Sequence, residues 1–317
     1  MMHVLQNFVG DPIRHRRFDL AWYRISQLLH DRTNGAFDYA YMRVARLLWG
    51  TIALPASPQM DAAAIADVVG RLRSDGYMIL PYRLSAEEID AITTFAFSTP
   101  AHGVDMGKSI SASPSNIPKG EPRLSWWMHD LARVPAIQRL VADGPYCAIA
   151  QEYLRCRPTL AHITLFLDAP YEGTYEPYRY HCDNEGPGFL KFFFFLTDVE
   201  IGTGAHYFIA GTHAHAKPHR FARMAFYDHD DLLDQFGRGK EVVIRGPAGT
   251  ILAEDTAGFH RGSTIERNYR LMMQFEFSAI EVPTEQELAR ELEPVAVPGI
   301  HPNIAGIARK YFAVAEK

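Results

Sequence analysis

The segment YRYHCD, residues 178–183, places a histidine and an aspartate two positions apart on a stretch expected to be extended. Side chains of an extended chain alternate between two faces, so His181 and Asp183 point one way and Cys182 points the other. One imidazole nitrogen and one carboxylate oxygen can therefore meet at a common point. Among 14 histidines and 37 acidic residues such a pair also arises by accident, and His229 with Asp231 repeats the spacing. Only the surrounding sequence can show which of the two His-x-Asp pairs is a candidate metal site.

A third candidate ligand lies far downstream. His260 falls in the run GTILAEDTAGFHRGS, residues 249–263. Two histidines and one carboxylate on one side of a metal form the facial arrangement of mononuclear non-haem Fe(II) enzymes, which leaves positions open for chemistry. The sequence thus offers His181, Asp183 and His260 as a metal-binding set.

Length and composition restrict the class of protein. A chain of 317 residues can bury a substantial core, as one large domain or as one domain with an appendage. The net charge of −5 gives no general basic field, so no nucleic-acid partner is expected. Three cysteines without metal-type spacing predict no disulfide framework and a reduced, cytoplasmic setting. We expect no signal peptide and no bilayer-spanning segment, because the first residues lack a long apolar core before their charges and no apolar run approaches the roughly 20 residues that span a bilayer.

The pattern of the chain changes near residue 160. From there on, short β-like runs alternate with glycine-containing turns, which predicts a sandwich or barrel. The expected strands are 161–167, 188–199, 204–211, 241–246, 249–255 and 268–280. We therefore expect a mainly β domain with flanking helices. The expected division is a helical extension at 1–60, a catalytic domain at 61–282 and a helical tail at 283–317.

Helical patterns dominate the first part of the chain. Residues 61–75 predict a helix, a short strand follows at 77–80, and Ser85 with Glu88 forms a capping box at the start of a second helix. A further stretch, residues 124–140, is expected to become helical after its first few residues.

Residues 15–54 predict two amphipathic helices with a break at 33–35. Their apolar residues at helical intervals are Phe18, Trp22, Ile25, Leu28, Leu29, Tyr39, Met42, Val44, Leu47 and Leu48. These faces have two interpretations: packing against the main domain, or peripheral contact with membrane lipid or a partner, which Arg43 and Arg46 could support. Packing is favoured, because most apolar helix faces cover a core.

Four segments together resemble the phytanoyl-CoA dioxygenase family of Fe(II)/2-oxoglutarate oxygenases. They are SDGYMILPYRLSAEEID at 74–90, HCD at 181–183, LTDVEIGTGAHYFIAGTH at 196–213 and GPAGTILAEDTAGFHRGS at 246–263. The resemblance implies a double-stranded β-helix, the distorted jelly roll of cupin-like proteins. It also implies His181, Asp183 and His260 as iron ligands, with 2-oxoglutarate and O₂ as co-substrates. The implied reaction is hydroxylation of a small molecule coupled to oxidative decarboxylation of 2-oxoglutarate to succinate and CO₂.

The resemblance further implies an arginine for the distal carboxylate of 2-oxoglutarate, on the strand after the second histidine. A guanidinium suits this task because it grips a carboxylate with two parallel hydrogen bonds. Arg270 lies ten residues after His260, one residue earlier than is usual in the family, and Gly262 stands where a small polar residue is common. Arg261 and Arg267 therefore remain alternatives.

Strand parity supports Arg270 independently of the resemblance. Arg270, Gln274 and Glu276 share one face of the expected strand, and apolar residues such as Leu271 and Phe275 share the other. A polar strand face can also lie in bulk water. We favour a cavity-lining face, given the histidine just upstream.

Further residues are expected near the co-substrate and the substrate. Lys191, inside the apolar run GFLKFFFFL, needs a partner when buried, which could be the co-substrate or an internal acid, or it could reach solvent from an edge. Ser263 and Gln274 are additional candidates for co-substrate contact. For the substrate we expect a contribution from an aromatic-rich lid, and the candidates are Arg123, Trp126, Tyr178, Tyr180 and His162.

Other functions stay open at this point. The same iron site can support desaturation or cyclisation, since the outcome depends on where the substrate C–H lies. A lipid- or carrier-linked substrate, such as a Kdo-type sugar, is a further alternative. A jelly-roll module without catalysis is the alternative from a different class.

Overall fold

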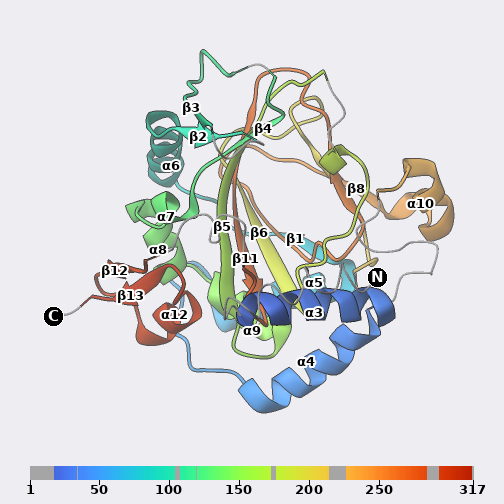
Figure 1. Cartoon of the computed structure of the whole chain (residues 1–317), viewed down its shortest axis with the longest axis vertical. Helices are drawn as coiled ribbons and strands as arrows, with labels where there is room; N and C mark the ends of the chain where they lie inside the picture. Colours follow the sequence, from blue (N-terminus) through green and yellow to red (C-terminus); the bar gives the residue numbers. More distant parts are fainter. Residues whose placement is uncertain are drawn as a thin grey trace.

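Two antiparallel sheets form the centre of the protein, whose computed structural model describes residues 18–33, 35–103, 108–118, 120–172, 176–213, 226–283 and 293–315 (Figure 1). The larger sheet contains, in order, β1 (Tyr77–Ile79), β9 (Ile251–Glu254), β6 (Phe189–Phe195), β11 (Arg270–Ser278), β5 (Thr159–Asp168), β4 (Arg123–Ser125), β2 (Ala101–His102) and β3 (Ser109–Ile110). The smaller sheet contains β10 (His260–Gly262), β7 (His206–Ile209) and β8 (Glu241–Ile244). The strands predicted from residue 161 onward are all present; β5 is longer than predicted and the other five are shorter.

The long central strands separate an apolar face from a polar one. On β11, Leu271, Met273 and Phe275 belong to the main hydrophobic core, as the parity of the sequence predicts. On β6, Phe192 and Phe194 belong to the same core. The opposite face of these strands looks toward the smaller sheet and carries the candidate site.

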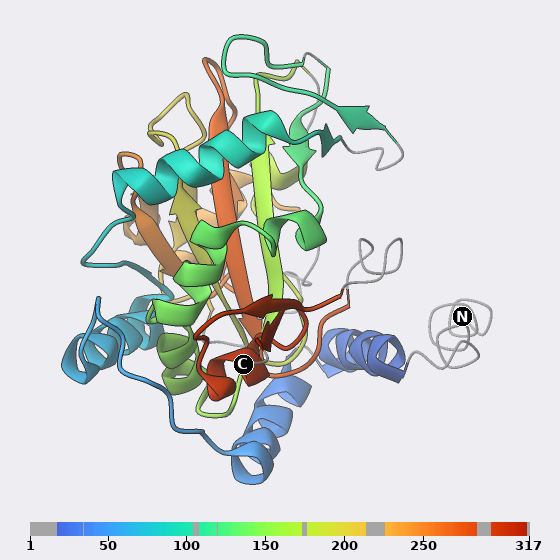
Figure 2. The same ribbon diagram turned by 90° about the vertical axis from the view of Figure 1, so that its left-hand side faces the viewer.

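Helices and the C-terminal segment cover the apolar face (Figure 2). The helices are α5 (Ala62–Asp75), α6 (Ala86–Ser98), α7 (Met128–Leu131), α8 (Pro135–Asp143) and α9 (Tyr146–Leu154). The ring of Tyr146 on α9 lies 5.1 Å from both Phe192 and Phe194, edge to face. The capping box at the start of α6 is confirmed, because Ser85 and Glu88 each bond the other's backbone N–H.

Two segments contain short strands as well as helices. Residues 123–125, at the start of the stretch expected to become helical, form β4 because they pair with the end of β5. The C-terminal tail is only partly helical: β12 (Val295–Val297) and β13 (Phe312–Val314) form a parallel pair beside α12 (Pro302–Ile307). Its residues Tyr311 and Phe312 enter the main core.

The N-terminal helices are α3 (Phe18–Thr33) and α4 (Ala36–Trp49), which lie along one outer edge of the molecule (Figure 1). Met42 and Ala45 are buried residues of α4. No described helix is both long enough and apolar enough to cross a bilayer. All three cysteines are buried free thiols.

Candidate active site

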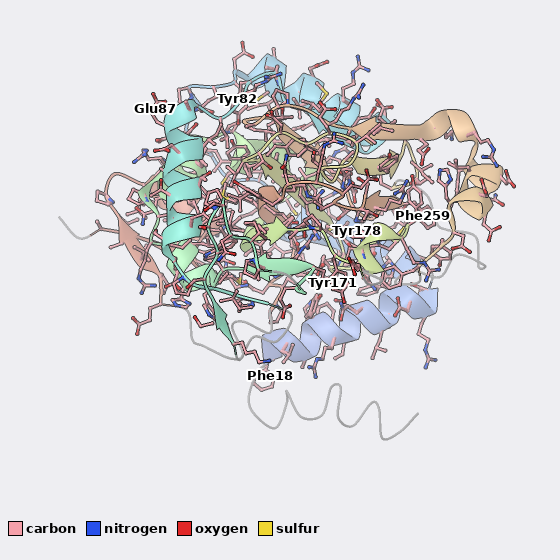
Figure 3. The ribbon with its side chains drawn as sticks, turned by 90° about the horizontal axis from the view of Figure 1, so that it is seen from above. Phe18, Tyr82, Glu87, Tyr171, Tyr178 and Phe259 are labelled. Carbon is pink, nitrogen blue, oxygen red and sulfur yellow. The ribbon has the colours of Figure 1, made fainter. Side chains whose placement is uncertain are left out.

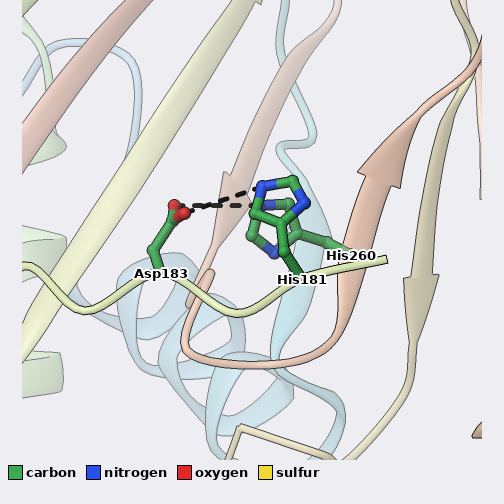
Figure 4. A group of neighbouring side chains, drawn as sticks. All are labelled: His181, Asp183 and His260. Carbon is green, nitrogen blue, oxygen red and sulfur yellow. Dashed lines mark ion pairs between the residues drawn. The ribbon is translucent and has the colours of Figure 1, made fainter. Parts of the chain in front are cut away.

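Three side chains predicted as metal ligands converge at one point between the two sheets (Figure 4). His181 and His260 exchange two backbone hydrogen bonds, each 3.0 Å long, and the N–H of Asp183 donates to the carbonyl of Thr256 at 2.9 Å. This pairing fixes the extended segment beside β10. Cys182 points away into a separate apolar cluster, so the expected alternation of side chains is present.

The orientation of both imidazoles suits metal binding. Nδ1 of His181 bonds the carbonyl of Arg179 at 2.9 Å, and Nδ1 of His260 bonds that of Gly258 at 3.0 Å. Each Nε2 is thereby left facing Asp183, at 3.8 Å from Oδ1 for His181 and 3.7 Å from Oδ2 for His260. These separations are too long for hydrogen bonds. The candidate ligand atoms lie within 4.8 Å of one another, which leaves room for an ion among them.

The surroundings of Asp183 and His260 favour their metal-binding forms. Burial and the neighbouring His181 lower the pKa of His260 to about 4, so its ring is neutral at pH 7. Burial would raise the pKa of Asp183, but Lys191 and the two histidines hold it well below its usual range. A carboxylate and neutral imidazoles are the forms that coordinate a metal.

Lys191 sits behind Asp183 in a buried cluster of charges. Its Nζ lies 2.7 Å from Asp183, 3.4 Å from Glu276 and 3.6 Å from Glu185. Burial would lower the pKa of Lys191, but the three carboxylates raise it well above its usual value. Of the alternatives for this lysine, the structure shows the internal-acid arrangement. Its contact with a co-substrate stays a prediction.

A second buried pair flanks His260. Nε2 of His206 lies 3.0 Å and 2.9 Å from the two carboxyl oxygens of Glu254, and the rings of His206 and His260 are stacked 5.6 Å apart. Burial lowers the pKa of His206 to about 3 and raises the pKa of Glu254 to about 8. At neutral pH the pair is therefore a protonated carboxyl bonded to a neutral imidazole, and it adds no net charge beside the candidate ligands.

Arg270 forms the opposite wall of the site together with Arg123. Nε and Nη2 of Arg270 bond Asp168 at 3.1 Å and 2.5 Å, and Nε and Nη2 of Arg123 bond the same carboxylate at 2.7 Å and 3.2 Å. Nη1 of Arg270 donates to the carbonyl of Gly204. A Cβ at Gly204, whose φ is +92°, would lie only 3.0 Å from Arg270, so glycine permits this approach. One N–H on each terminal nitrogen of Arg270 remains for a carboxylate.

The two walls enclose one cavity of about 200 Å³. Besides the candidate ligands and both arginines, its lining includes Phe166, Pro177, Tyr178, Lys191, Phe193, His206, Gly262, Met272 and Gln274. Tyr178 lies near the middle of the molecule when it is seen from above (Figure 3). The structure therefore brings the predicted residues Arg270, Gln274, Lys191, Arg123 and Tyr178 to the cavity.

Four other predicted contacts do not reach this cavity. Trp126 is a core residue whose indole N–H bonds the carbonyl of Thr99, and Tyr180 is buried with its hydroxyl on Glu241. His162 lies against Glu276, at 3.3 Å. Ser263 is absent from the cavity lining, where Gly262 stands instead. These four side chains therefore do not line the cavity, and their contact with a substrate or co-substrate stays a prediction.

The structure also places the alternatives to the main candidates. Arg261 stacks on Tyr207 at 3.9 Å, and Arg267 is exposed and bonds the carbonyl of Ile201, so Arg270 is the one of the three that lines the cavity. His229 lies in α10 (His229–Phe236) and bonds Glu241. Among the described residues it belongs to no cluster of side chains that could hold a metal ion.

Sequence reasoning missed the buried acids that support the site. Asp168, Glu276 and Glu254 are fully buried on central strands. For Asp168 and Glu276 the available signal was parity, because they share strand faces with Phe166 and Gln274, which line the cavity. Glu254 shares its face of β9 with the core residue Leu252, so parity gave no signal there. An acid on an otherwise apolar strand needs a cationic or hydrogen-bonding partner. The sequence did not show which residues those partners are.

Comparisons with known proteins establish the fold. No family model matches the chain, and no curated protein matches it. Among solved structures, the chain is similar to EctD from S. alaskensis, determined with 2-oxoglutarate and 5-hydroxyectoine, at 20% identity and a TM-score of 0.52, covering 77% of this chain and 88% of that one. It is also similar to SnoK, a non-heme alpha ketoglutarate dependent carbocyclase from nogalamycin biosynthesis, at 15% identity and a TM-score of 0.51, covering 76% and 95%. This likeness confirms the predicted jelly-roll fold.

Proposed function

We propose that the protein is an Fe(II)- and 2-oxoglutarate-dependent oxygenase that hydroxylates an unactivated C–H bond of a small molecule. Within that class, the sequence motifs favour a phytanoyl-CoA dioxygenase-like enzyme. The three buried thiols, Cys147, Cys156 and Cys182, support a reducing, cytoplasmic setting.

One observation carries this proposal. The ligand atoms of His181, Asp183 and His260 face the same 200 Å³ cavity as the guanidinium of Arg270. A dicarboxylate with a keto group needs a metal at one end and a cation at the other, and these are the two ends of this cavity. The donor set also fits Fe(II), because two imidazoles and one carboxylate leave several coordination positions open.

Each residue has a distinct task in the proposed reaction. Fe(II), when bound with 2-oxoglutarate and O₂, supplies the oxidising power that a C–H bond requires. His181, Asp183 and His260 hold the metal, and Lys191 keeps Asp183 ionised and oriented through their 2.7 Å contact. Arg270 fixes the distal carboxylate of the co-substrate, and Asp168 holds that guanidinium in place. Phe166, Phe193 and Met272 exclude water from the cavity.

The test is co-substrate turnover by anaerobically purified protein reconstituted with Fe(II). We expect O₂-dependent conversion of 2-oxoglutarate to succinate, and His181→Ala is expected to abolish it. His229→Ala is the matched control, since His229 has the same spacing to an aspartate but lies in α10. Wild-type protein that forms no succinate with a broad substrate panel, or His181→Ala protein that still forms it, contradicts the proposal.

Two alternatives predict different results. A binding module with this fold takes up no stoichiometric iron and is unaffected by His260→Ala, so metal analysis separates it from an enzyme. Desaturation or cyclisation consumes 2-oxoglutarate equally but leaves no new oxygen atom in the product, so mass spectrometry with ¹⁸O₂ separates it from hydroxylation. A lipid-linked sugar substrate belongs in the panel.

A further inference from the structure

The exposed apolar surface of the protein is concentrated on the N-terminal helices. Seven of the eleven exposed large apolar side chains among the described residues belong to α3 and α4. They are Phe18, Trp22, Tyr39, Val44, Leu47, Leu48 and Trp49. Phe18 points away from the body of the molecule at one end of α3 (Figure 3). Single apolar residues on a surface are ordinary, but a concentrated group marks an interaction site.

The outer side of α4 carries a continuous apolar row. Val44, Leu47 and Leu48 follow helical spacing, and 52%, 85% and 70% of their surfaces are exposed. An amphipathic helix normally turns such a row toward the core. Here Met42 and Ala45 are the residues that face the core. The packing interpretation favoured by the sequence therefore holds for only one side of this helix.

The exposure does not come from loose attachment. Met42 packs on Gly188, where an added Cβ would lie 2.5 Å from its sulfur. Nε of Arg46 donates to the carbonyl of Leu154 at 3.1 Å. On α3, the amide of Gln27 donates to the carbonyl of Asn184 at 2.9 Å. The apolar row is thus presented to the outside by a helix pair that is fixed to the domain.

A basic cavity borders a different side of α4, at Arg43 and Arg46, and Arg43 lies one helical turn from Leu47 of the row. It has a volume of about 590 Å³, and four arginines line it: Arg43, Arg46, Arg73 and Arg155. Two aspartates also line it, but Asp38 contacts His30 and Asp255 accepts a 2.6 Å hydrogen bond from Tyr153. Burial and the nearby charges of Arg155 and Arg73 lower the pKa of Arg46, which reflects a concentration of positive charge.

We propose that the α3–α4 face docks on an anionic phospholipid bilayer, with Val44, Leu47 and Leu48 entering the acyl boundary and the arginine cavity receiving a phosphate headgroup. An anionic lipid combines apolar chains with a phosphate, which are the two groups that an apolar row and a cavity lined by arginines bind. The chain as a whole carries a net charge of −5, so the local arginines and not the overall field must select the anionic lipid. A helix with an apolar row and flanking arginines lies in the plane of the interface and does not cross it.

Vesicle co-sedimentation of the full-length protein tests this docking mode. We expect binding to vesicles of phosphatidylcholine with phosphatidylglycerol, and little binding to phosphatidylcholine alone. Leu47→Glu/Leu48→Glu is expected to weaken binding by about tenfold or more. Arg43→Glu/Arg155→Glu is expected to lose at least about fivefold for each arginine. All four side chains are exposed, so the variants should fold normally.

Matched controls come from other faces of the protein. Ile201→Glu changes another exposed large apolar residue, and Arg139→Glu changes an exposed arginine on α8. Both should bind vesicles like the wild type. Equal loss in the controls, or no vesicle binding at all, overturns the proposal. Binding of inorganic phosphate without vesicle binding would mean a soluble-anion site only, and a dimer that Leu47→Glu/Leu48→Glu dissociates would mean a self-association face; either also overturns it.

Discussion

The two faces of the main sheet are made by the same strands but have different roles: one packs in the hydrophobic core, and the other carries the candidate site. On one face of β11, Leu271, Met273 and Phe275 pack under the helices without a polar atom in their side chains that needs a hydrogen bond. On the other face, Arg270 and Glu276 are equally buried but are held by ion pairs and hydrogen bonds. Because side chains alternate along a strand, residues that stabilise the core and residues that form the candidate site follow each other in the sequence.

This comparison shows why the site tolerates so many buried charges. Fully buried acids are costly unless they are paired. Here each has a partner: Asp168 has two arginines, Glu276 has Lys191 and His162, and Glu254 has His206. The apolar face supplies the burial energy that allows this arrangement. Substitutions on one face should therefore change metal and co-substrate binding, and substitutions on the other should change folding.

The largest effect is expected for His260→Ala on the polar face. Losing a candidate ligand should reduce Fe(II) affinity by more than the roughly 10–100-fold that changes in the surrounding residues cause. Folding should be largely retained, because the backbone pair between His260 and His181 does not need the side chain. Anaerobic metal titration and thermal unfolding of the apo-protein measure the two quantities. Unchanged iron affinity would rule out His260 as a ligand.

Phe275→Ala should give the reverse pattern. Phe275 is fully buried on the apolar face, with its ring 4.7 Å from that of Phe194. Truncation leaves a cavity and should lower the free energy of unfolding by about 3–5 kcal/mol. Denaturant titration measures this loss. The iron affinity of the folded variant should match the wild type, and a large drop there would show that the two faces are not independent.

Arg270→Leu should weaken 2-oxoglutarate binding to the metal-loaded protein by about 10–100-fold, as expected for loss of a charged, bidentate contact. Calorimetry under anaerobic conditions is the measurement. Arg267→Leu is the matched control, because Arg267 is a nearby exposed arginine outside the cavity. Equal binding by both variants would assign the distal carboxylate to another cation, with Arg123 the first candidate.

Much of this division was predictable from the sequence. Parity assigned Leu271 and Phe275 to the core and Arg270 to the cavity, because a strand fixes the direction of every side chain once one is known. The convergence of His181, Asp183 and His260 was predictable from a two-residue spacing together with a family pattern. The contact of Lys191 with Glu276 was not, because Glu276 lies 85 positions away and only the register of β6 against β11 brings them opposite each other. The placement of Tyr180 and Trp126 outside the cavity was not predictable for the same reason: an aromatic residue near a site can pack or bind, and distant contacts decide which.

The smallest effect concerns the protonated acid beside the candidate ligands. The pKa of Glu254 is raised by burial to about 8 in the folded protein, whereas an unfolded glutamate titrates near 4.3. Between these values the unfolded chain has lost this proton and the folded protein has kept it, so the contribution of Glu254 to stability decreases as the pH rises. The slope is at most about 1.4 kcal/mol per pH unit, and it ends once the folded carboxyl also ionises.

Glu254→Gln removes this slope and keeps a hydrogen-bonding group opposite His206. Between about pH 7 and pH 8, His206 and His260 are mostly neutral both in the folded protein and in the unfolded chain, so they add little pH dependence of their own. Wild-type apo-protein should therefore lose about 1 kcal/mol relative to the variant across this interval. Denaturant titrations at the two pH values measure the difference. A difference that does not change with pH would mean that Glu254 is already ionised, and that the polar face carries one more negative charge beside the ligands than we infer.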